Sequence, residues 1–230
     1  MARLVLGTNK QVGVPAFYKK SMEPIPTGKY QLFDRVYTDT GTVIGTVCGF
    51  FSGAHDGSTD YQEYAVVILD TTYRHNGQPW TKNTGLISEL PVWDTVTAFD
   101  VNMFHETATF ATDILVSKNS AAAQYCRNFS FLIEGTTYYG QLPNLIEMEC
   151  LFKNGSVLDN LDSSITPSTM YYFYIQAGKL DPYSGGAIWT STQGGANYAA
   201  TGSNQTGACS LRGYKTNYSM VFPILELPNA

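Results

Sequence analysis

The chain has little charge: only 14% of its 230 residues are Asp, Glu, Lys or Arg, against about a quarter in an ordinary soluble domain. Its net charge is −5, and its only basic run is the pair Lys19 and Lys20. Proteins that bind nucleic acid carry a basic patch or stripe, so nucleic acid is excluded as the main partner. A sparsely charged surface is common where subunits cover one another, which predicts a homo-oligomer, with a dimer expected before a trimer.

Long hydrophobic runs and paired cysteine motifs are missing as well. No apolar stretch is long enough to span a bilayer, and the first residues hold an apolar run too short for a secretion signal. We therefore expect synthesis in a cytoplasm, with no membrane insertion. Without any C-x-x-C motif, a zinc ribbon and a dithiol redox site are both excluded. The widely spaced cysteines are expected to be buried free thiols: Cys48, Cys126, Cys150 and Cys209.

Residues 1–24 differ from the rest of the chain. Their short hydrophobic pieces are separated by Gly and Pro and cannot bury themselves, so they must add to a sheet or dock on another protein. Pro24 and Pro26 end the segment, because two prolines can continue neither a helix nor a strand ladder. This predicts an extended N-terminal docking arm followed by one domain over residues 25–230. The residues expected to make the arm's contacts are Leu4, Leu6, Val12, Val14 and Phe17.

Most of residues 25–230 has the pattern of short strands separated by turns. Alternating segments joined by Asp- and Gly-rich turns predict an antiparallel meander near the start. Two helices are predicted, one at 117–128 and one after Leu142-Pro143, while residues 70–115 are expected to be mostly irregular. The predicted class is therefore α+β, β-rich, with antiparallel sheets. The predicted strands are 31–37, 42–51, 64–69, 170–175, 186–192, 208–212 and 218–227.

Two motifs in the second half of the chain are more specific. Leu142-Pro143 precedes Glu147 at the expected helix start, and Trp189 begins the sequence Trp-Thr-Ser-Thr. With the order of elements, these motifs resemble the C-type-lectin-fold modules of bacterial and phage surface proteins, over roughly residues 28–228. Phe222 stands where that family has Arg before Pro. The resemblance implies a C-type-lectin-like domain with two helices and antiparallel sheets.

The arm resembles, over residues 6–15, the docking peptides of capsid-attached fibre proteins in tailed phages, including the crAss-like group. This likeness implies a structural protein of the virion surface, such as a head fibre, assembled in the host cytoplasm. Its arm would bind capsid or other virion proteins, and its lectin-type domain would face a host-surface glycan or protein. The alternative is a bacterial cell-surface adhesin whose export signal lies outside this chain. A third class is a ligand-binding protein diversified by a retroelement.

One polar segment, residues 190–207, has the composition of a binding surface. It is uncharged and rich in Gly, Ser, Asn and Tyr, and antibody-like surfaces use these residues because Tyr gives contact area at low entropy cost. The competing interpretation is a long hairpin loop that contacts nothing. The residues expected to bind a ligand are Asn197, Tyr198, Asn204, Gln205, Asn217 and Tyr218.

Other tempting residues have plainer explanations. Trp189 could stack on a sugar, but its place in an alternating strand beside Ile188 favours a core tryptophan. The Glu-Pro-Asn and Trp-Asn-Asp signatures of calcium-dependent lectins are absent, so we expect neither a metal nor a cofactor. Oxidases of the resembled fold need a cysteine pair near the C-terminal end, where this chain has only Cys209. The chain is therefore not expected to be an enzyme.

Overall fold

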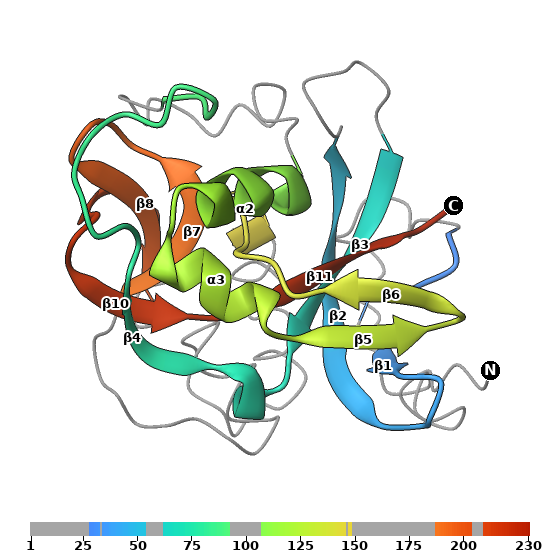
Figure 1. Ribbon diagram of the computed structural model, residues 1–230. Coiled ribbons are helices and arrows are strands. Elements are labelled where there is room, and N and C mark those ends of the chain that lie inside the picture. Colours follow the sequence, from blue (N-terminus) through green and yellow to red (C-terminus); the bar gives the residue numbers. More distant parts are fainter. Residues whose placement is uncertain are drawn as a thin grey trace, which may run out of the picture.

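The computed structural model describes residues 28–32, 34–53, 62–92, 107–145, 147–148, 187–203 and 209–230. Within these ranges two main sheets lie side by side, with two helices in front of their junction (Figure 1). The predicted β-rich α+β class with mainly antiparallel sheets is therefore confirmed. The predicted docking arm, with Leu4, Leu6, Val12, Val14 and Phe17, lies outside the described residues, as does the predicted strand at 170–175.

The first sheet contains the predicted meander. Its strand order is β1-β2-β3-β11, and every neighbouring pair is antiparallel. The alternation seen in the sequence places one set of side chains in a shared core, where Val67 of β3 lies opposite Leu225 of β11. The strands are β1 (Arg35–Tyr37), β2 (Val43–Gly53), β3 (Gln62–Leu69) and β11 (Ile224–Pro228).

A hairpin that the sequence analysis did not predict covers this core. Its strands are β5 (Ser130–Ile133) and β6 (Thr136–Tyr139), and Phe131 and Ile133 pack into the first sheet's core. The two turn residues, Glu134 and Gly135, have φ angles of 52° and 75°, as a tight two-residue hairpin turn requires. The carboxylate of Asp39 accepts hydrogen bonds from both of their N–H groups, so the turn is held to the meander.

The C-terminal end of the chain closes the first sheet. Asn229 is buried, its N–H donates to the Glu63 carbonyl at 2.9 Å, and its side-chain amide donates to the Glu63 carboxylate at 2.6 Å. Its carbonyl groups in turn accept from Lys29 at 3.1 Å and Tyr30 at 2.8 Å. One asparagine therefore joins the first described residues, β3 and the end of β11.

We expect Asn229→Ala to lower the free energy of unfolding by about 2 kcal/mol, because it removes two buried side-chain hydrogen bonds, one of them to a carboxylate. Urea denaturation followed by tryptophan fluorescence measures this change. Asn217→Ala is the matched control, since Asn217 is exposed. Equal stability of the two variants would contradict the role given to Asn229.

The second sheet has the strand order β4-β10-β7-β8-β9, with β10 and β7 parallel and the other neighbours antiparallel. Strands β7, β9 and β10 lie where the sequence predicted strands. The other two strands were not predicted: β4 lies in the stretch 70–115, which was expected to be irregular, and β8 lies in the polar segment 190–207. The strands are β4 (His75–Pro79), β7 (Ala187–Gln193), β8 (Tyr198–Ser203), β9 (Cys209–Tyr214) and β10 (Tyr218–Val221).

The single strand predicted at 218–227 is wrong, because Phe222 and Pro223 divide it. Proline has no N–H for a ladder, so β10 ends in the second sheet and β11 begins in the first. Phe222 is buried, and the Arg74 guanidinium lies 4.6 Å from the centre of its ring. One continuous segment therefore connects the two sheets.

Two helices stand in front of the sheets, and one of them was not predicted. The predicted helix at 117–128 is α3 (Ala121–Arg127), capped by the Ser120 hydroxyl, which accepts from the Ala123 N–H at 3.2 Å. Preceding it is α2 (Ala108–Ser117), in the stretch expected to be irregular. Its first N–H groups are satisfied by Glu226 of β11, from 118 residues away. Nearby sequence gave no sign of that cap.

The helix predicted after Leu142-Pro143 has its start within the described residues. Asn144 and Glu147 form a reciprocal cap: each side chain accepts a 2.8 Å hydrogen bond from the other residue's N–H. Pro143 therefore precedes the cap rather than forming the first helical turn. Leu145 and Met148 are buried as predicted, and the remainder of the expected stripe lies outside the described residues.

Side chains from the helices and the second sheet form a second core. Trp80 and Trp189 are fully buried there, together with Leu115 and Leu142. Cys48 and Cys126 are buried free thiols, as predicted for them, and burial raises the pKa of Cys126. Among the described residues no helix has the length and apolar character needed to cross a membrane.

Candidate functional site

Three tyrosines gather at one end of the second sheet: Tyr198, which is half-buried, and Tyr214 and Tyr218, which are exposed. Tyr198 begins β8 and lies directly opposite Tyr214, the last residue of β9; their ring centres are 4.8 Å apart and their hydroxyls 3.2 Å apart. Tyr218 begins β10 after a three-residue turn and is 76% exposed. Asn197 and Asn217 are exposed beside these tyrosines. We call these five residues the tyrosine surface.

A buried lysine fixes the turn that carries this surface. Lys215 is fully buried, and its ammonium donates 2.7 Å hydrogen bonds to the Gly85 carbonyl and to the Gln193 side chain. It also lies 4.8 Å from the ring centre of Trp80, and burial lowers its pKa to about 8. The Lys215 N–H donates to the Asn197 carbonyl at 3.0 Å, which ties this turn to the turn before β8. The tyrosines therefore project from a fixed support.

Four of the six residues predicted to bind a ligand meet at this surface: Asn197, Tyr198, Asn217 and Tyr218. The other two, Asn204 and Gln205, lie outside the described residues. The competing interpretation of residues 190–207 as one long loop is wrong, because β7 continues to Gln193 and β8 crosses the segment with Ala199 and Ala200 buried.

Small side chains make this strand possible, since they fit beneath Trp189. A Cβ on Gly213, opposite Ala199, would come within 2.7 Å of the Trp189 ring. The same contact shows that Trp189 is a core residue, as predicted: it is fully buried and its indole N–H donates to the Gln78 carbonyl at 2.7 Å. Tyr214 was missed, because the predicted strand stopped at residue 212. Extending the predicted strand by two residues would have included Tyr214, which in the structure lies opposite Tyr198.

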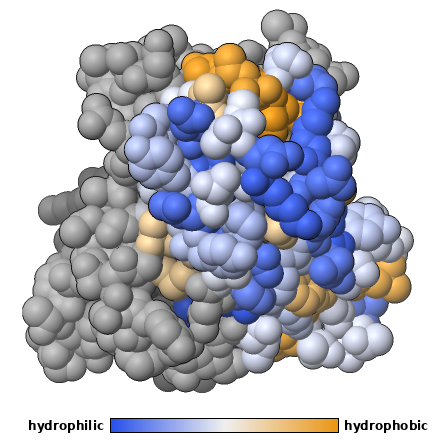
Figure 2. Space-filling model, turned by 60° about the vertical axis from the view of Figure 1, so that its left-hand side comes forward, coloured by the Kyte–Doolittle hydropathy of each residue, from blue (hydrophilic) through white to orange (hydrophobic). Residues whose placement is uncertain are grey.

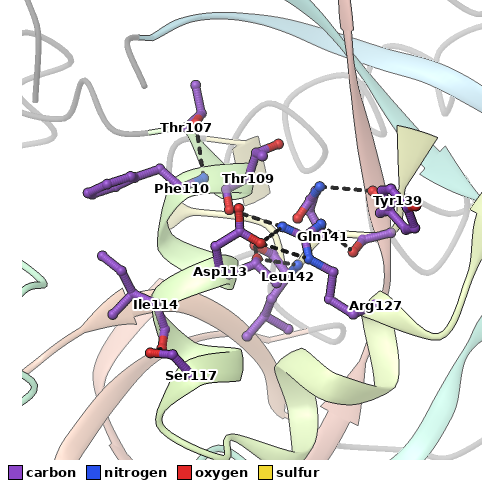
Figure 3. Close-up of polar contacts among 12 residues, drawn as sticks. Thr107, Thr109, Phe110, Asp113, Ile114, Ser117, Arg127, Tyr139, Gln141 and Leu142 are labelled. Atoms are coloured by element: carbon purple, nitrogen blue, oxygen red, sulfur yellow. Dashed lines mark hydrogen bonds and ion pairs between the residues drawn. The ribbon is translucent and has the colours of Figure 1, made fainter. Parts of the chain in front are cut away.

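A groove of about 690 Å³ opens on the other sheet, between α2, β6 and the end of β11. Its wall includes the ion pair of Arg127 with Asp113, and Arg127 also donates to the carbonyls of Gly140 and Thr109 (Figure 3). Tyr139 is half exposed at its rim. We call it the β6/β11 groove, and none of its residues was singled out from the sequence.

Among the described residues, no cluster of three His, Cys, Asp or Glu side chains is placed to bind a metal. The coloured part of the face in Figure 2 is mostly hydrophilic, with hydrophobic patches at its top and at its lower right. Large exposed apolar or aromatic side chains among these residues are Leu86, Val92, Leu132, Tyr139, Tyr214 and Tyr218. Three of these six are tyrosines: Tyr139 lies at the rim of the β6/β11 groove, and Tyr214 and Tyr218 belong to the tyrosine surface.

Comparison with known proteins gives one similar fold. No protein-family model matches the chain, and no curated protein matches it. Among solved structures, it is similar to a fimbrial protein from Bacteroides ovatus ATCC 8483, with a TM-score of 0.52 and 17% sequence identity. The match covers 86% of this chain but 49% of that one, so this chain spans about half the length of the fimbrial protein. At this identity the similarity shows a shared fold alone, and it supports neither the expected C-type-lectin assignment nor the expected phage origin.

Proposed function

We propose that the chain is a non-catalytic recognition module of a bacterial cell surface, and that it binds its partner through the tyrosine surface. The observation that carries this proposal is the group of Tyr198, Tyr214 and Tyr218 with two exposed asparagines on a fixed support. Tyr and Asn dominate adaptable binding surfaces, and tyrosines held rigid lose little entropy on binding.

The fold similarity favours the cell-surface role over the virion role. The similar protein is fimbrial and comes from a bacterium, whereas no phage protein is among the matches. We therefore prefer the adhesin alternative to the head-fibre role that the arm suggested. This preference concerns location, since the tyrosine surface serves recognition in either setting.

A C-type-lectin-type arrangement is part of the proposal, and contacts between the two resembling motifs support it. Next to Trp189, Ser191 donates its N–H to the Pro143 carbonyl at 2.7 Å. The Thr192 hydroxyl accepts from the Leu145 N–H at 3.1 Å. The Leu-Pro helix start and the Trp-Thr-Ser-Thr strand are therefore joined directly.

The location is tested with antibodies against the purified chain. We expect them to label intact cells of the bacterium that encodes it, at the level seen after permeabilisation. Label that appears only after permeabilisation, or that co-sediments with phage particles in a density gradient, would reject the cell-surface role.

The site is tested with fluorescent full-length chain on arrays of immobilised mucin-type oligosaccharides and extracellular-matrix proteins. Central interface tyrosines typically account for 1–2 kcal/mol or more, so Tyr218→Ala and Tyr214→Ala should each weaken the strongest array signal by roughly fivefold or more. Leu132→Ala is the control, because Leu132 is 48% exposed, close to the 51% of Tyr214, and lies on the β5–β6 hairpin rather than on the second sheet. If Tyr218→Ala and Tyr214→Ala both bind as strongly as the wild type, the tyrosine surface is not the binding site.

A further inference from the structure

The β6/β11 groove lies between two strands that meet at one end and separate at the other. They are joined at Gln141 and Ile224, whose N–H and C=O groups exchange hydrogen bonds of 2.8 and 3.0 Å. Beyond this bridge β6 pairs only with β5 and β11 only with β3, among the described strands. In Figure 1 the yellow β6 and the red β11 run apart from this junction toward the right. The groove is therefore bounded by two open strand edges.

Both edges turn main-chain groups toward the groove. Along an antiparallel strand, alternate residues direct their N–H and C=O groups to the same side. Ile224 directs these groups to Gln141, so Glu226, two residues on, directs its own to the same open side. In β6, Tyr138 pairs with Phe131 of β5, which leaves Thr137 facing outward. Such edges accept an added extended peptide.

A second observation points to an N–H donor as the missing partner. The Gln141 side chain is 4% exposed and lines the groove where the two strands meet. Its amide nitrogen donates to the Tyr139 carbonyl at 2.9 Å (Figure 3), while its oxygen has no hydrogen-bond partner among the described residues. A buried carbonyl oxygen without a partner costs about 1–3 kcal/mol. A peptide N–H entering the groove would satisfy it.

The chain carries a segment with the right chemistry, and the first described residue after it, Gly28, lies next to a neighbour of this groove. The first described residue, Gly28, packs against Asn229, which follows the groove residue Pro228. In residues 1–24, Leu4 with Leu6 and Val12 with Val14 are spaced two apart, so each pair shares one face of an extended chain.

The opposite charges of residues 1–24 and of the rest of the chain favour a second copy as the partner that binds this segment. Residues 1–24 hold four basic residues and one acidic residue, although the whole chain has a net charge of −5, so the rest of the molecule is distinctly negative. The groove lining holds two acidic residues, Asp113 and Glu226, against one basic residue, Arg127, and the Asp113 side chain is 62% exposed. Within one copy, the residues that precede Gly28 in the sequence include Pro24 and Pro26, whose nitrogens cannot donate to a strand edge.

We propose that the N-terminal arm of one copy binds in the β6/β11 groove of a second copy, adding a strand between β6 and β11. Because arm and groove are different surfaces, the contact is heterologous, and repeated contacts build a head-to-tail chain or a ring. This inference is independent of the ligand of the tyrosine surface, since that surface lies on the other sheet.

Sedimentation equilibrium of the full-length chain tests the proposal with two variants. Tyr139→Arg places a charged side chain at the groove rim, and the double variant Leu4→Asp, Leu6→Asp removes an apolar pair from the arm. We expect the wild-type mass to rise with concentration, and each variant to reduce the association constant by roughly tenfold or more. Leu132→Arg on the same hairpin, and Tyr218→Ala, should associate as the wild type does. Thermal melts check that every variant is folded.

Mixing the two defective variants gives the decisive measurement. The arm variant keeps an intact groove and the groove variant an intact arm, so an equimolar mixture should form a dimer and nothing larger. The proposal is overturned if the wild type stays a single copy at about 100 µM, if either variant associates like the wild type, or if the mixture fails to dimerise. Tyrosine-surface variants that lose their array signal yet still associate would separate this inference from the proposed function.

Discussion

Replacing Glu226 with alanine is expected to lower the free energy of unfolding by about 3 kcal/mol, one of the largest effects of any exchange outside the two tryptophans. The carboxylate accepts hydrogen bonds from the Ala108 N–H at 2.7 Å, the Thr109 N–H at 2.9 Å and the Thr109 hydroxyl at 2.6 Å. Hydrogen bonds to a charged group contribute about 1.5–3 kcal/mol, and a negative charge at a helix N-terminus adds to this. The Ala108 N–H is also buried and would lose its partner.

Urea denaturation measures the change, and amide hydrogen exchange in α2 locates it. We expect the N–H groups of Ala108 and Thr109 to exchange faster in the variant, while those of β2 follow global unfolding. Glu226→Gln keeps one acceptor oxygen and should lose about half as much stability. The Thr107 hydroxyl also caps this helix, because it accepts from the Phe110 N–H at 3.2 Å. An alanine variant within 1 kcal/mol of the wild type, with unchanged exchange in α2, would show that Thr107 is sufficient as the cap.

The contact between Glu226 and the start of α2 illustrates why the sequence could predict some parts of the fold and not others. The meander and α3 follow from local patterns: alternating side chains in β2 and β3, and a serine cap before an alanine run in α3. Helix α2 depends on a carboxylate from the last strand, and no pattern within residues 107–117 reveals such a partner. Its β-branched Thr residues even argue against a helix.

The candidate site was predictable to a similar degree. Composition identified the tyrosine- and asparagine-rich segment, because surface contact uses those residue types directly. It could not show that β8 runs through the segment, since that strand depends on Ala199 fitting beneath Trp189 and on the absence of a Cβ at Gly213. The β6/β11 groove arises where elements far apart in the sequence meet, so composition gave no sign of it.

The second large effect concerns a buried acid beside Glu226. Glu147 is 1% exposed, and burial together with the neighbouring Glu226 carboxylate raises the pKa of Glu147 well above its usual value of 4.5. One Glu147 oxygen accepts the Asn144 N–H at 2.8 Å. Glu147 therefore keeps its proton in the folded protein to a higher pH than in the unfolded chain, because its charged form would be buried beside the Glu226 carboxylate.

A raised pKa in the folded state makes stability depend on pH in a definite direction. Below pH 4.5 Glu147 is protonated in both the folded and the unfolded chain, and its contribution is fully present. As the pH rises above 4.5, the unfolded chain releases this proton while the folded chain retains it. Unfolding therefore becomes more favourable with rising pH, until the pH passes the folded-state pKa of Glu147. Each unit of that interval costs about 1.4 kcal/mol.

Glu147→Gln should remove this dependence and stabilise the protein at neutral pH. A glutamine oxygen can accept the Asn144 N–H, and its amide can donate to Glu226 as the protonated acid does, without a proton to lose. We expect the variant to match the wild type at pH 4 and to exceed its unfolding free energy increasingly above pH 4.5, until the pH passes the folded-state pKa of Glu147, in urea titrations at each pH. Glu89→Gln is the control, and its effect on the unfolding free energy should have the opposite sign. Hydrogen bonds from Lys118 and Ser88 lower the pKa of this exposed acid to about 2, so its ionised form favours the folded state. Parallel curves for Glu147→Gln and the wild type would mean that Glu147 is ionised in the folded protein at the same pH as in the unfolded chain.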